Sequence, residues 1–174
     1  AMGPEGWTFG EAPESILGAI HLHDVYTTSD PTFSGRCTVP VLWDLEAGTI
    51  VNNESAEIMR MLNSAFDAVG GRADLDLCPV ELRDEIDAVN APIYDNVNNG
   101  VYKSGFATTQ EAYDVAVTAL FEELDRLEAR LSQQRYLVGD RVTEADWRLF
   151  TTLVRFDPVY VGHFKCNIRQ LKEY

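Results

Sequence analysis

The chain has 174 residues, of which 45% are hydrophobic, so it is long enough to bury an apolar core in one domain or in two small ones. Its formal net charge of -14 at pH 7 is spread along the sequence and argues against a nucleic-acid partner, because nucleic acids are bound by clustered Lys and Arg. No apolar run approaches the roughly twenty residues of a membrane span and no signal peptide opens the sequence, so we expect a cytoplasmic protein without a membrane partner.

The first 35 residues are rich in Gly, Pro, Ser and Thr, which is typical of a connecting segment. Within this segment we predict one short helix from about Ser15 to Tyr26. Pro13 precedes the predicted helix, and the turn sequence Ser29-Asp30-Pro31 follows it.

An antiparallel hairpin is predicted next, because an apolar run from Val39 to Trp43 and a second run from Thr49 to Val51 flank a turn-rich interval. A helix is then predicted from Ser55 to Phe66, where apolar side chains recur at helical spacing, with Asn53 as its N-cap. Two strands are not stable alone in water, so the hairpin needs other elements packed against it.

The pair Gly70-Gly71 marks a linker, and beyond Pro79 every periodic segment is helical. A first apolar stripe is predicted to kink or break near Pro92. A capping box from Thr108 to Glu111 is predicted to open a second helix, and Thr143 with Asp146 a third. The two stripes are Leu82, Ile86, Val89, Ile93 and Val97, and then Val115, Ala119, Leu120, Leu124, Leu127 and Leu131.

Cysteine and histidine residues give no metal-site pattern. Cys37, Cys78 and Cys166 are far apart and form neither a CxxC motif nor a Cys/His ligand spacing. His21 and His23 alternate with apolar residues, and the third histidine lies in another segment. We therefore expect no metal site and no disulfide framework.

Six segments of the sequence carry a specific pattern. They are GWTF at 6–9, GRCTVPVLWD at 35–44, GTIVNNES at 48–55, NNGVYKSGFATTQEAYD at 98–114, YLVGDRVTEADWRLF at 136–150 and RFDPVYVGHFKCN at 155–167. In this order the six segments resemble the glutathionyl-hydroquinone reductases, the xi class of glutathione transferases. The resemblance covers nearly the whole chain, and the last segment is its most specific part.

The resemblance implies a glutathione transferase fold, α+β to mostly α. Residues 1–70 are expected to form a partial thioredoxin-like, glutathione-binding domain that lacks its first strand, first helix and second strand. Residues 79–174 are expected to form the all-helical C-terminal domain without its last helices. The family is generally dimeric through that domain, so a homodimer is expected.

The implied activity is the reduction of glutathionyl-hydroquinones, with glutathione as cosubstrate, through a mixed disulfide between a Cys and glutathione. In relatives this nucleophile sits in a Cys-Pro-Trp-Ala motif at a helix start, where the helix dipole favours the thiolate. This chain has no such motif, because Cys78-Pro79 is followed by Val80-Glu81. We therefore expect little or no reductase activity from the chain as it stands.

The resemblance also implies a glutathione site. Trp7, Arg36 and Val39 are expected to contact the peptide, with Pro40 cis and the Val39 backbone bonded to the cysteinyl unit. Glu54 is expected to pair with the γ-glutamyl ammonium, and the Ser55 hydroxyl and the helix amides with its carboxylate.

Two tyrosines take the places of the family's remaining site residues. Tyr102 occupies the place of the proton donor or acceptor to the substrate, and Tyr160 that of a tyrosine that donates a hydrogen bond to the thiolate. For both, a purely structural hydroxyl is the alternative.

Two other functions stay open from the sequence. The first is a non-catalytic glutathione-transferase-like module that binds without turnover. The second is thiol transfer through Cys37, which lies two residues before Val39; a buried, inert thiol is the favoured interpretation of that residue.

Overall fold

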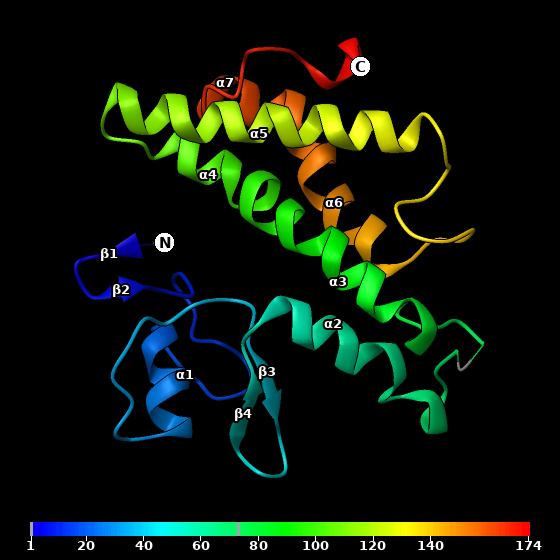
Figure 1. Cartoon of the computed structure of the whole chain (residues 1–174). Helices are drawn as coiled ribbons and strands as arrows, with labels where there is room; N and C mark the ends of the chain where they lie inside the picture. Colours follow the sequence, from blue (N-terminus) through cyan, green and yellow to red (C-terminus); the bar gives the residue numbers. More distant parts are fainter. Residues whose placement is uncertain (1, 73) are drawn as a thin grey trace. The chain divides into compact units, whose positions relative to one another are not determined.

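The computed structural model describes residues 2–72 and 74–174, so Ala1, with which the first predicted domain begins, lies outside the described residues. The chain divides into two compact units (Figure 1). The first unit ends at Gly71, the second residue of the predicted Gly70-Gly71 linker, and the second unit runs from Arg72 to Tyr174.

The first unit combines two short hairpins with two helices. Its antiparallel pairs are β1 with β2 and β3 with β4, and the second pair is the predicted hairpin, which is confirmed. The register of that pair is irregular between Leu42 and Trp43. The elements are β1 (Met2–Gly3), β2 (Gly6–Trp7), α1 (Leu22–Ser29), β3 (Leu42–Asp44), β4 (Thr49–Asn52), α2 (Ser55–Ser64) and the 3-10 turn η1 (Asp67–Val69).

Helix α1 starts and ends later than the predicted helix, whose bounds were wrong. The carboxylate of Glu14 accepts hydrogen bonds from the backbone N–H groups of Ile16 and Leu17, both at 2.7 Å, and so fixes a turn there. Gly18 then takes a φ of 69°, which a helix does not allow. The helix begins only after His21, its N-cap residue.

Helix α2 begins at Ser55 as predicted, but its N-cap is Glu54 and the prediction of Asn53 was wrong. The side-chain amide of Asn53 donates instead to the Tyr26 hydroxyl and to Thr38 Oγ1, each at 3.1 Å. Asn53 therefore ties two loops together rather than capping the helix.

The second unit is helical, with the long α5 packed along α4 and the turn before it (Figure 1). A π-helical turn begins directly after Pro92, where the predicted kink lies, and Asn99 N donates to the Tyr94 carbonyl five residues back, at 2.9 Å. The elements are η2 (Val80–Leu82), α3 (Arg83–Pro92), the π turn η3 (Ile93–Asn98), α4 (Gly100–Gly105), α5 (Gln110–Leu131), α6 (Glu144–Arg155), the π turn η4 (Phe156–Tyr160), α7 (Val161–His163) and the 3-10 turn η5 (Leu171–Glu173).

One apolar core fills the second unit. The first predicted stripe lies on it, with its members buried or packed against it. The second stripe was partly wrong, because Val115 is 69% exposed and α5 turns the neighbouring face inward. The buried residues of α5 are Val117, Leu120, Phe121, Leu124 and Leu127, together with the carboxylate residue Glu123. No helix within the described residues is both long and apolar enough to cross a membrane.

Side-chain caps mark the starts of α5 and α6. The N-cap of α5 is Thr109, whose hydroxyl accepts from Ala112 N at 3.2 Å, so the predicted box from Thr108 was wrong by one residue. The predicted box at α6 is confirmed: Asp146 Oδ2 accepts from the backbone N–H of Thr143 at 2.8 Å and from its hydroxyl at 3.1 Å.

Candidate functional site

In the first unit, the segment before Pro40 meets the start of α2. The Val39–Pro40 peptide bond is cis, as predicted. The residue before Val39, Thr38, is joined through its hydroxyl to the Asn53 amide at 3.1 Å. Asn53 directly precedes Glu54, so the hydrogen bond between Thr38 and Asn53 joins the segments that carry Val39 and Glu54.

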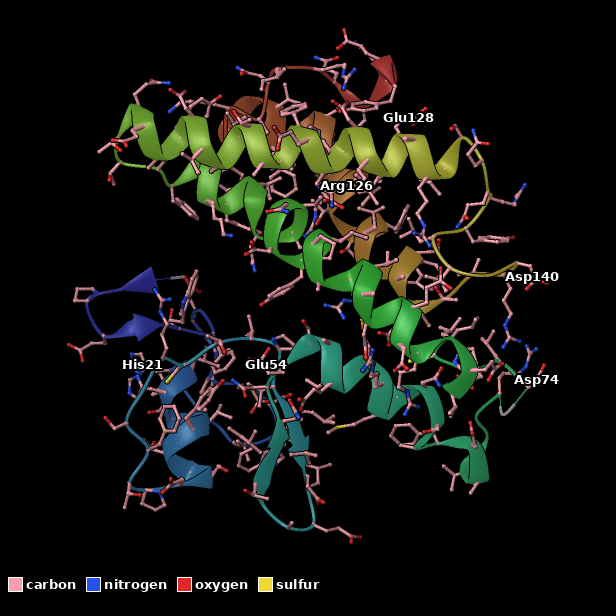
Figure 2. The ribbon with its side chains drawn as sticks, in the orientation of Figure 1. His21, Glu54, Asp74, Arg126, Glu128 and Asp140 are labelled. Atoms are coloured by element: carbon pink, nitrogen blue, oxygen red, sulfur yellow. The ribbon has the colours of Figure 1, made fainter. Side chains whose placement is uncertain are left out.

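Glu54 lies at the start of α2 (Figure 2), where no side chain of the described residues caps the first helix amides. Glu54 and Ser55 are both exposed. The side chain of Asn52 accepts a hydrogen bond from Glu54 N at 2.6 Å, which fixes the entry of the chain into the helix. The first N–H groups of a helix attract carboxylates, so this end can take an anion while Glu54 takes a cation.

The other predicted peptide contacts are less closely tied to this place. Arg36 is exposed and lies two residues before Thr38 in the same loop. Trp7 lies on β2 and is 52% exposed. The hydrogen bonds that join Thr38 to Asn53 include neither Arg36 nor Trp7.

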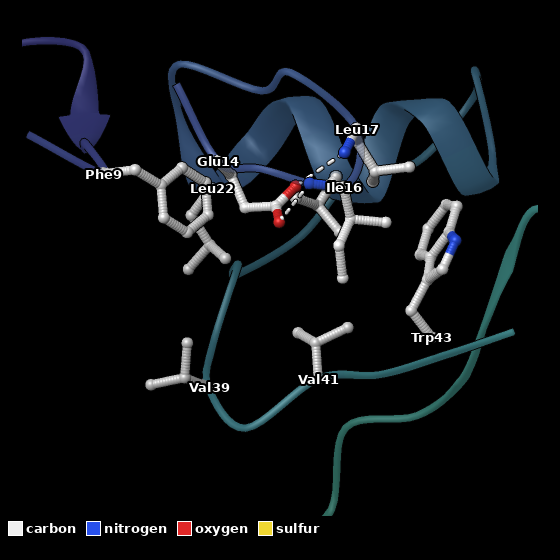
Figure 3. Close-up of a pocket in the computed structure, with 9 residues that line it drawn as sticks. Phe9, Glu14, Ile16, Leu17, Leu22, Val39, Val41 and Trp43 are labelled. Carbon is white, nitrogen blue, oxygen red and sulfur yellow. Dashed lines mark hydrogen bonds between the residues drawn. The ribbon is translucent and has the colours of Figure 1, made fainter. Parts of the chain in front are cut away.

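An apolar cavity of about 240 Å³ lies between α1 and the segment that leads into β3 (Figure 3). Val39 and Trp43 line it from one side and Leu22 from the other (Figure 3). Its one carboxylate, Glu14, already accepts two backbone hydrogen bonds. The cavity therefore suits an apolar group rather than the charged ends of a peptide.

The thiols of the chain are poor nucleophiles. Burial raises the pKa of Cys37, which is half-buried, and raises the pKa of Cys166 to about 11. Cys78 is also buried, at 5% exposure. Because the thiolate is the reactive form, the inert interpretation of Cys37 is the better one at neutral pH.

In the second unit, the structure brings Tyr102 on α4 together with Tyr160 at the end of η4. Their hydroxyl oxygens are 3.4 Å apart, and their rings meet edge to face with centroids 5.9 Å apart. Tyr160 is 3% exposed, whereas Tyr102 is 41% exposed. Burial, and then the hydrogen bond with Tyr102, raise the pKa of Tyr160 to about 12, so its hydroxyl keeps its proton at neutral pH.

Phe164 fixes this pair and was missed by sequence reasoning. Its ring stacks on Tyr160 at a centroid distance of 5.5 Å and lies 5.4 Å from Tyr102. It also lies against Gly105, where an added Cβ would come within 1.8 Å of Phe164 Cδ1. Gly105 is therefore needed for the close approach of the Phe164 ring to α4. The sequence signal for this contact was the presence of Gly105 and Phe164 in two of the segments that carry the family resemblance.

His21, His23 and Asp24 form a small cluster at the start of α1, with ligand-type atoms within 4.8 Å of one another. The Asp24 carboxylate accepts from His21 N at 2.8 Å and from Ile20 N at 3.1 Å. These bonds, that from His21 first, lower the pKa of Asp24. The cluster thus acts as a helix cap, in which one carboxylate oxygen of Asp24 accepts both backbone hydrogen bonds.

Family models for two domains match the sequence. The glutathione S-transferase N-terminal domain matches residues 2–65, and the glutathione S-transferase C-terminal domain matches residues 110–174. The two matches lie on either side of the boundary between the compact units.

Curated relatives match nearly the whole chain. Glutathionyl-hydroquinone reductase PcpF of Sphingobium chlorophenolicum is 58% identical over 177 residues, with 99% of this chain and 56% of that protein covered. Glutathionyl-hydroquinone reductase YqjG of Escherichia coli is 56% identical, with 97% and 53% covered. The chain therefore spans about half the length of the curated relatives it matches.

Solved structures agree in fold. The glutathione-bound structure of YqjG from Escherichia coli superposes with a TM-score of 0.94 at 55% identity, over 99% of this chain and 58% of that one. Glutathione transferase Xi 1 from Trametes versicolor gives a TM-score of 0.91 at 55% identity, over 99% and 62%.

Proposed function

The chain belongs to the glutathionyl-hydroquinone reductase family, the xi class of glutathione transferases, and on that premise we propose that it forms part of a glutathione-dependent reductase of glutathionyl-hydroquinones. One observation carries the proposal. Over almost its whole length the chain is more than half identical to two proteins named for this activity.

The first unit is proposed to bind glutathione. The Val39 backbone would pair with the extended peptide, as strand-like ligands do with open backbone groups. Glu54 would hold the ammonium, and Ser55 with the first amides of α2 would hold the neighbouring carboxylate. Trp7 and Arg36 complete the proposed peptide contacts. The exposure of Glu54 and Ser55 beside the Thr38 loop supports this assignment.

The second unit is proposed to assist the chemistry. A thiolate attacks the sulfur of the glutathionyl-hydroquinone, an S–S bond forms, and the bond between that sulfur and the ring carbon breaks. The ring carbon keeps the electron pair and takes a proton, for which Tyr102 is the proposed donor. A second glutathione thiolate then resolves the mixed disulfide and releases glutathione disulfide. Tyr160, which stays protonated, is proposed to donate a hydrogen bond to the attacking thiolate.

The attacking thiolate is not assigned to any cysteine of this chain. Cys37 and Cys166 have raised pKa values, and Cys78 is buried. The sequence carries no Cys-Pro-Trp-Ala motif, so the proposal requires the nucleophile to come from elsewhere in the functional protein. The inert thiols are also what a non-catalytic binding module would have, so that function is the second candidate.

Turnover of a glutathionyl-hydroquinone by the native protein that contains this chain tests the proposal. We expect hydroquinone and glutathione disulfide in equal amounts, and a Tyr102→Phe variant with a lower kcat and an unchanged Kd for glutathione. Tyr94→Phe removes another half-exposed tyrosine hydroxyl of the same unit and is the control. Glutathione binding without turnover would favour the binding module, and absence of both would contradict either function.

Assembly and location belong to the same proposal. We propose a homodimer formed through the helical unit, to be tested by sedimentation equilibrium of the native protein. A monomer at micromolar concentration would contradict it. A cytoplasmic location fits the three free thiols, since glutathione keeps thiols reduced there, and cell fractionation tests it.

A further inference from the structure

The hydroxyl of Tyr26 is bonded to Thr38 and Asn53, the residues that directly precede Val39 and Glu54 of the proposed glutathione site. Tyr26 comes from α1 and is 4% exposed. Its hydroxyl donates to the Thr38 carbonyl at 2.7 Å and accepts from Thr38 N at 3.1 Å. It also accepts from the side-chain amide of Asn53 at 3.1 Å. One oxygen thus joins α1, the Thr38 loop and the residues that lead into α2.

These bonds use the full capacity of the group. A tyrosine hydroxyl has one proton to donate and two lone pairs to accept with, and all three are taken here. The ring is held by Phe33, with centroids 4.8 Å apart. Tyr26 therefore has no hydrogen-bonding capacity left for a ligand, and its effect on a ligand must pass through the backbone it holds.

The two groups that Tyr26 holds adjoin the groups proposed to contact glutathione. Both backbone polar atoms of Thr38 are bonded to it, and Thr38 directly precedes Val39. Asn53 directly precedes Glu54, and its amide bridges the Tyr26 hydroxyl and Thr38 Oγ1. The distance between the Val39 backbone and the amide end of α2 is thus set through one buried side chain.

We propose that Tyr26 is a positioning residue that holds the Val39 backbone and the start of α2 at the spacing a bound glutathione needs. This inference rests on the proposed function, since it takes the ligand of the site from there. The physical reason is pre-organisation: a peptide that contacts two segments binds more tightly when their spacing is fixed before it arrives.

The test is glutathione binding by the native protein that contains this chain, measured by titration calorimetry at a temperature where every variant is folded. Tyr26→Phe keeps the ring and removes the hydroxyl, and we expect the Kd for glutathione to rise about tenfold. Ser29→Ala is the matched control. It also removes a hydroxyl of α1 that is bonded twice, to Ile50 N at 3.0 Å and to Thr49 Oγ1 at 2.7 Å, but away from Thr38 and Asn53.

A second readout separates positioning from general stability. Amide hydrogen exchange at Thr38, Val39 and Ser55 should speed up in Tyr26→Phe and not in Ser29→Ala, even where both variants lose equally in Tm. If Tyr26→Phe does not fold, Asn53→Ala replaces it, because this variant removes the link on the α2 side and leaves the Tyr26 ring in place. We expect its Kd to rise several-fold.

The outcomes distinguish the inference from its premise. Wild-type native protein that does not bind glutathione overturns the proposed site and the inference together. Wild-type protein that binds, with equal Kd values for wild type, Tyr26→Phe and Asn53→Ala, overturns the inference alone. Equal losses in Tyr26→Phe and Ser29→Ala also overturn it, because they would show a general effect of loosening α1.

Discussion

The two compact units are stabilised in different ways. In the second unit, side chains from four helices and two π turns form one buried core, and Phe156, Ile86 and Leu120 are completely buried. Among the residues of the first unit whose burial the structure describes, the buried apolar ones are Ala19 and three members of α1, while α2 has no buried residue. Directed polar contacts such as those of Tyr26 join elements of this unit.

The two units show the separate roles of apolar burial, which stabilises a fold, and of hydrogen bonds, which fix the positions of its loops. An apolar core gains free energy in proportion to the area that it buries, whereas a hydrogen bond requires its donor and acceptor within a narrow range of distance and angle. The second unit therefore owes its stability to its core. The first unit owes the positions of its loops to a small number of directed bonds, and four variants or conditions test that division.

The largest expected effect comes from the core of the second unit. Phe156→Ala removes a completely buried ring and should cost about 3–5 kcal/mol of unfolding free energy. Leu45→Ala, at a side chain 70% exposed in the first unit, should cost less than about 0.5 kcal/mol. Urea unfolding of each variant measures both. Equal losses of unfolding free energy in the two variants would contradict this division between the units.

Close packing at one glycine gives the next effect. Gly105→Ala places a Cβ inside the Phe164 ring's space and should cost about 1–3 kcal/mol through displacement of that ring. Gly162→Ala is the matched control, because a Cβ there meets nothing within 4 Å. Thermal unfolding compares the two. If both variants melt alike, Phe164 does not depend on Gly105 for its place.

Helix caps allow a direct comparison between units. Asp146→Ala in the second unit should cost about 1–2 kcal/mol, since Asp146 caps α6 and also accepts from Leu137 N at 2.9 Å. Asp24→Ala removes the corresponding cap of α1 and should cost about 0.5–1 kcal/mol. Chemical unfolding measures each loss. A larger loss for Asp24 would mean that the first unit depends on its caps more than the second does.

Acidification should have the smallest effect and opposite signs in the two units. Hydrogen bonds lower the pKa values of Glu14 and Asp24. The stability that these two carboxylates give to the first unit is therefore complete above the ordinary carboxyl range, about pH 4, and is lost as pH falls through the lowered pKa values. Burial raises the pKa of Glu123 in the second unit, so that unit gains stability as pH falls through the raised value.

Amide exchange measured between pH 7 and pH 3 should therefore show the second unit strengthening first and α1 loosening only below about pH 4. Glu123→Gln should remove this gain of stability in the second unit and leave the response of α1 unchanged. A parallel decline of both units from pH 7 would contradict the assignment of these carboxyl groups.

Much of the fold follows from local patterns in the sequence. The hairpin, the start of α2 at Ser55, the capping box of Thr143 and Asp146, and the break after Pro92 were all predictable, because each depends on neighbours in sequence. The turn that replaces the start of the predicted helix at Ser15 could not be predicted in this way, because the hydrogen bonds of the Glu14 side chain and the φ of Gly18 determine it. Val115 was misjudged because two faces of α5 carry apolar residues.

The candidate site was predictable only as far as the family resemblance extended. The hydroxyl oxygens of Tyr102 and Tyr160 lie 3.4 Å apart, and the roles assigned to the site residues stay predictions. Asn53 was misjudged because its partner, Tyr26, is 27 residues away in sequence. Tyr26 itself was missed because no local pattern distinguishes a buried tyrosine that packs from one that also joins loops.

The two π-helical turns bear on how the chain tolerates insertions and deletions. A turn closed by a bond five residues back contains one residue more than an α-helical turn needs, as a single-residue insertion would produce. The turn η4 ends on Tyr160, and η3 ends four residues before Tyr102. Deleting the extra residue of either turn would leave an α-helical turn and keep the following side chains in register, whereas deleting one residue inside the regular helix α5 would rotate the side chains after it by about 100°. An alignment gap of one residue at η3 or η4 would thus leave the two hydroxyls facing each other.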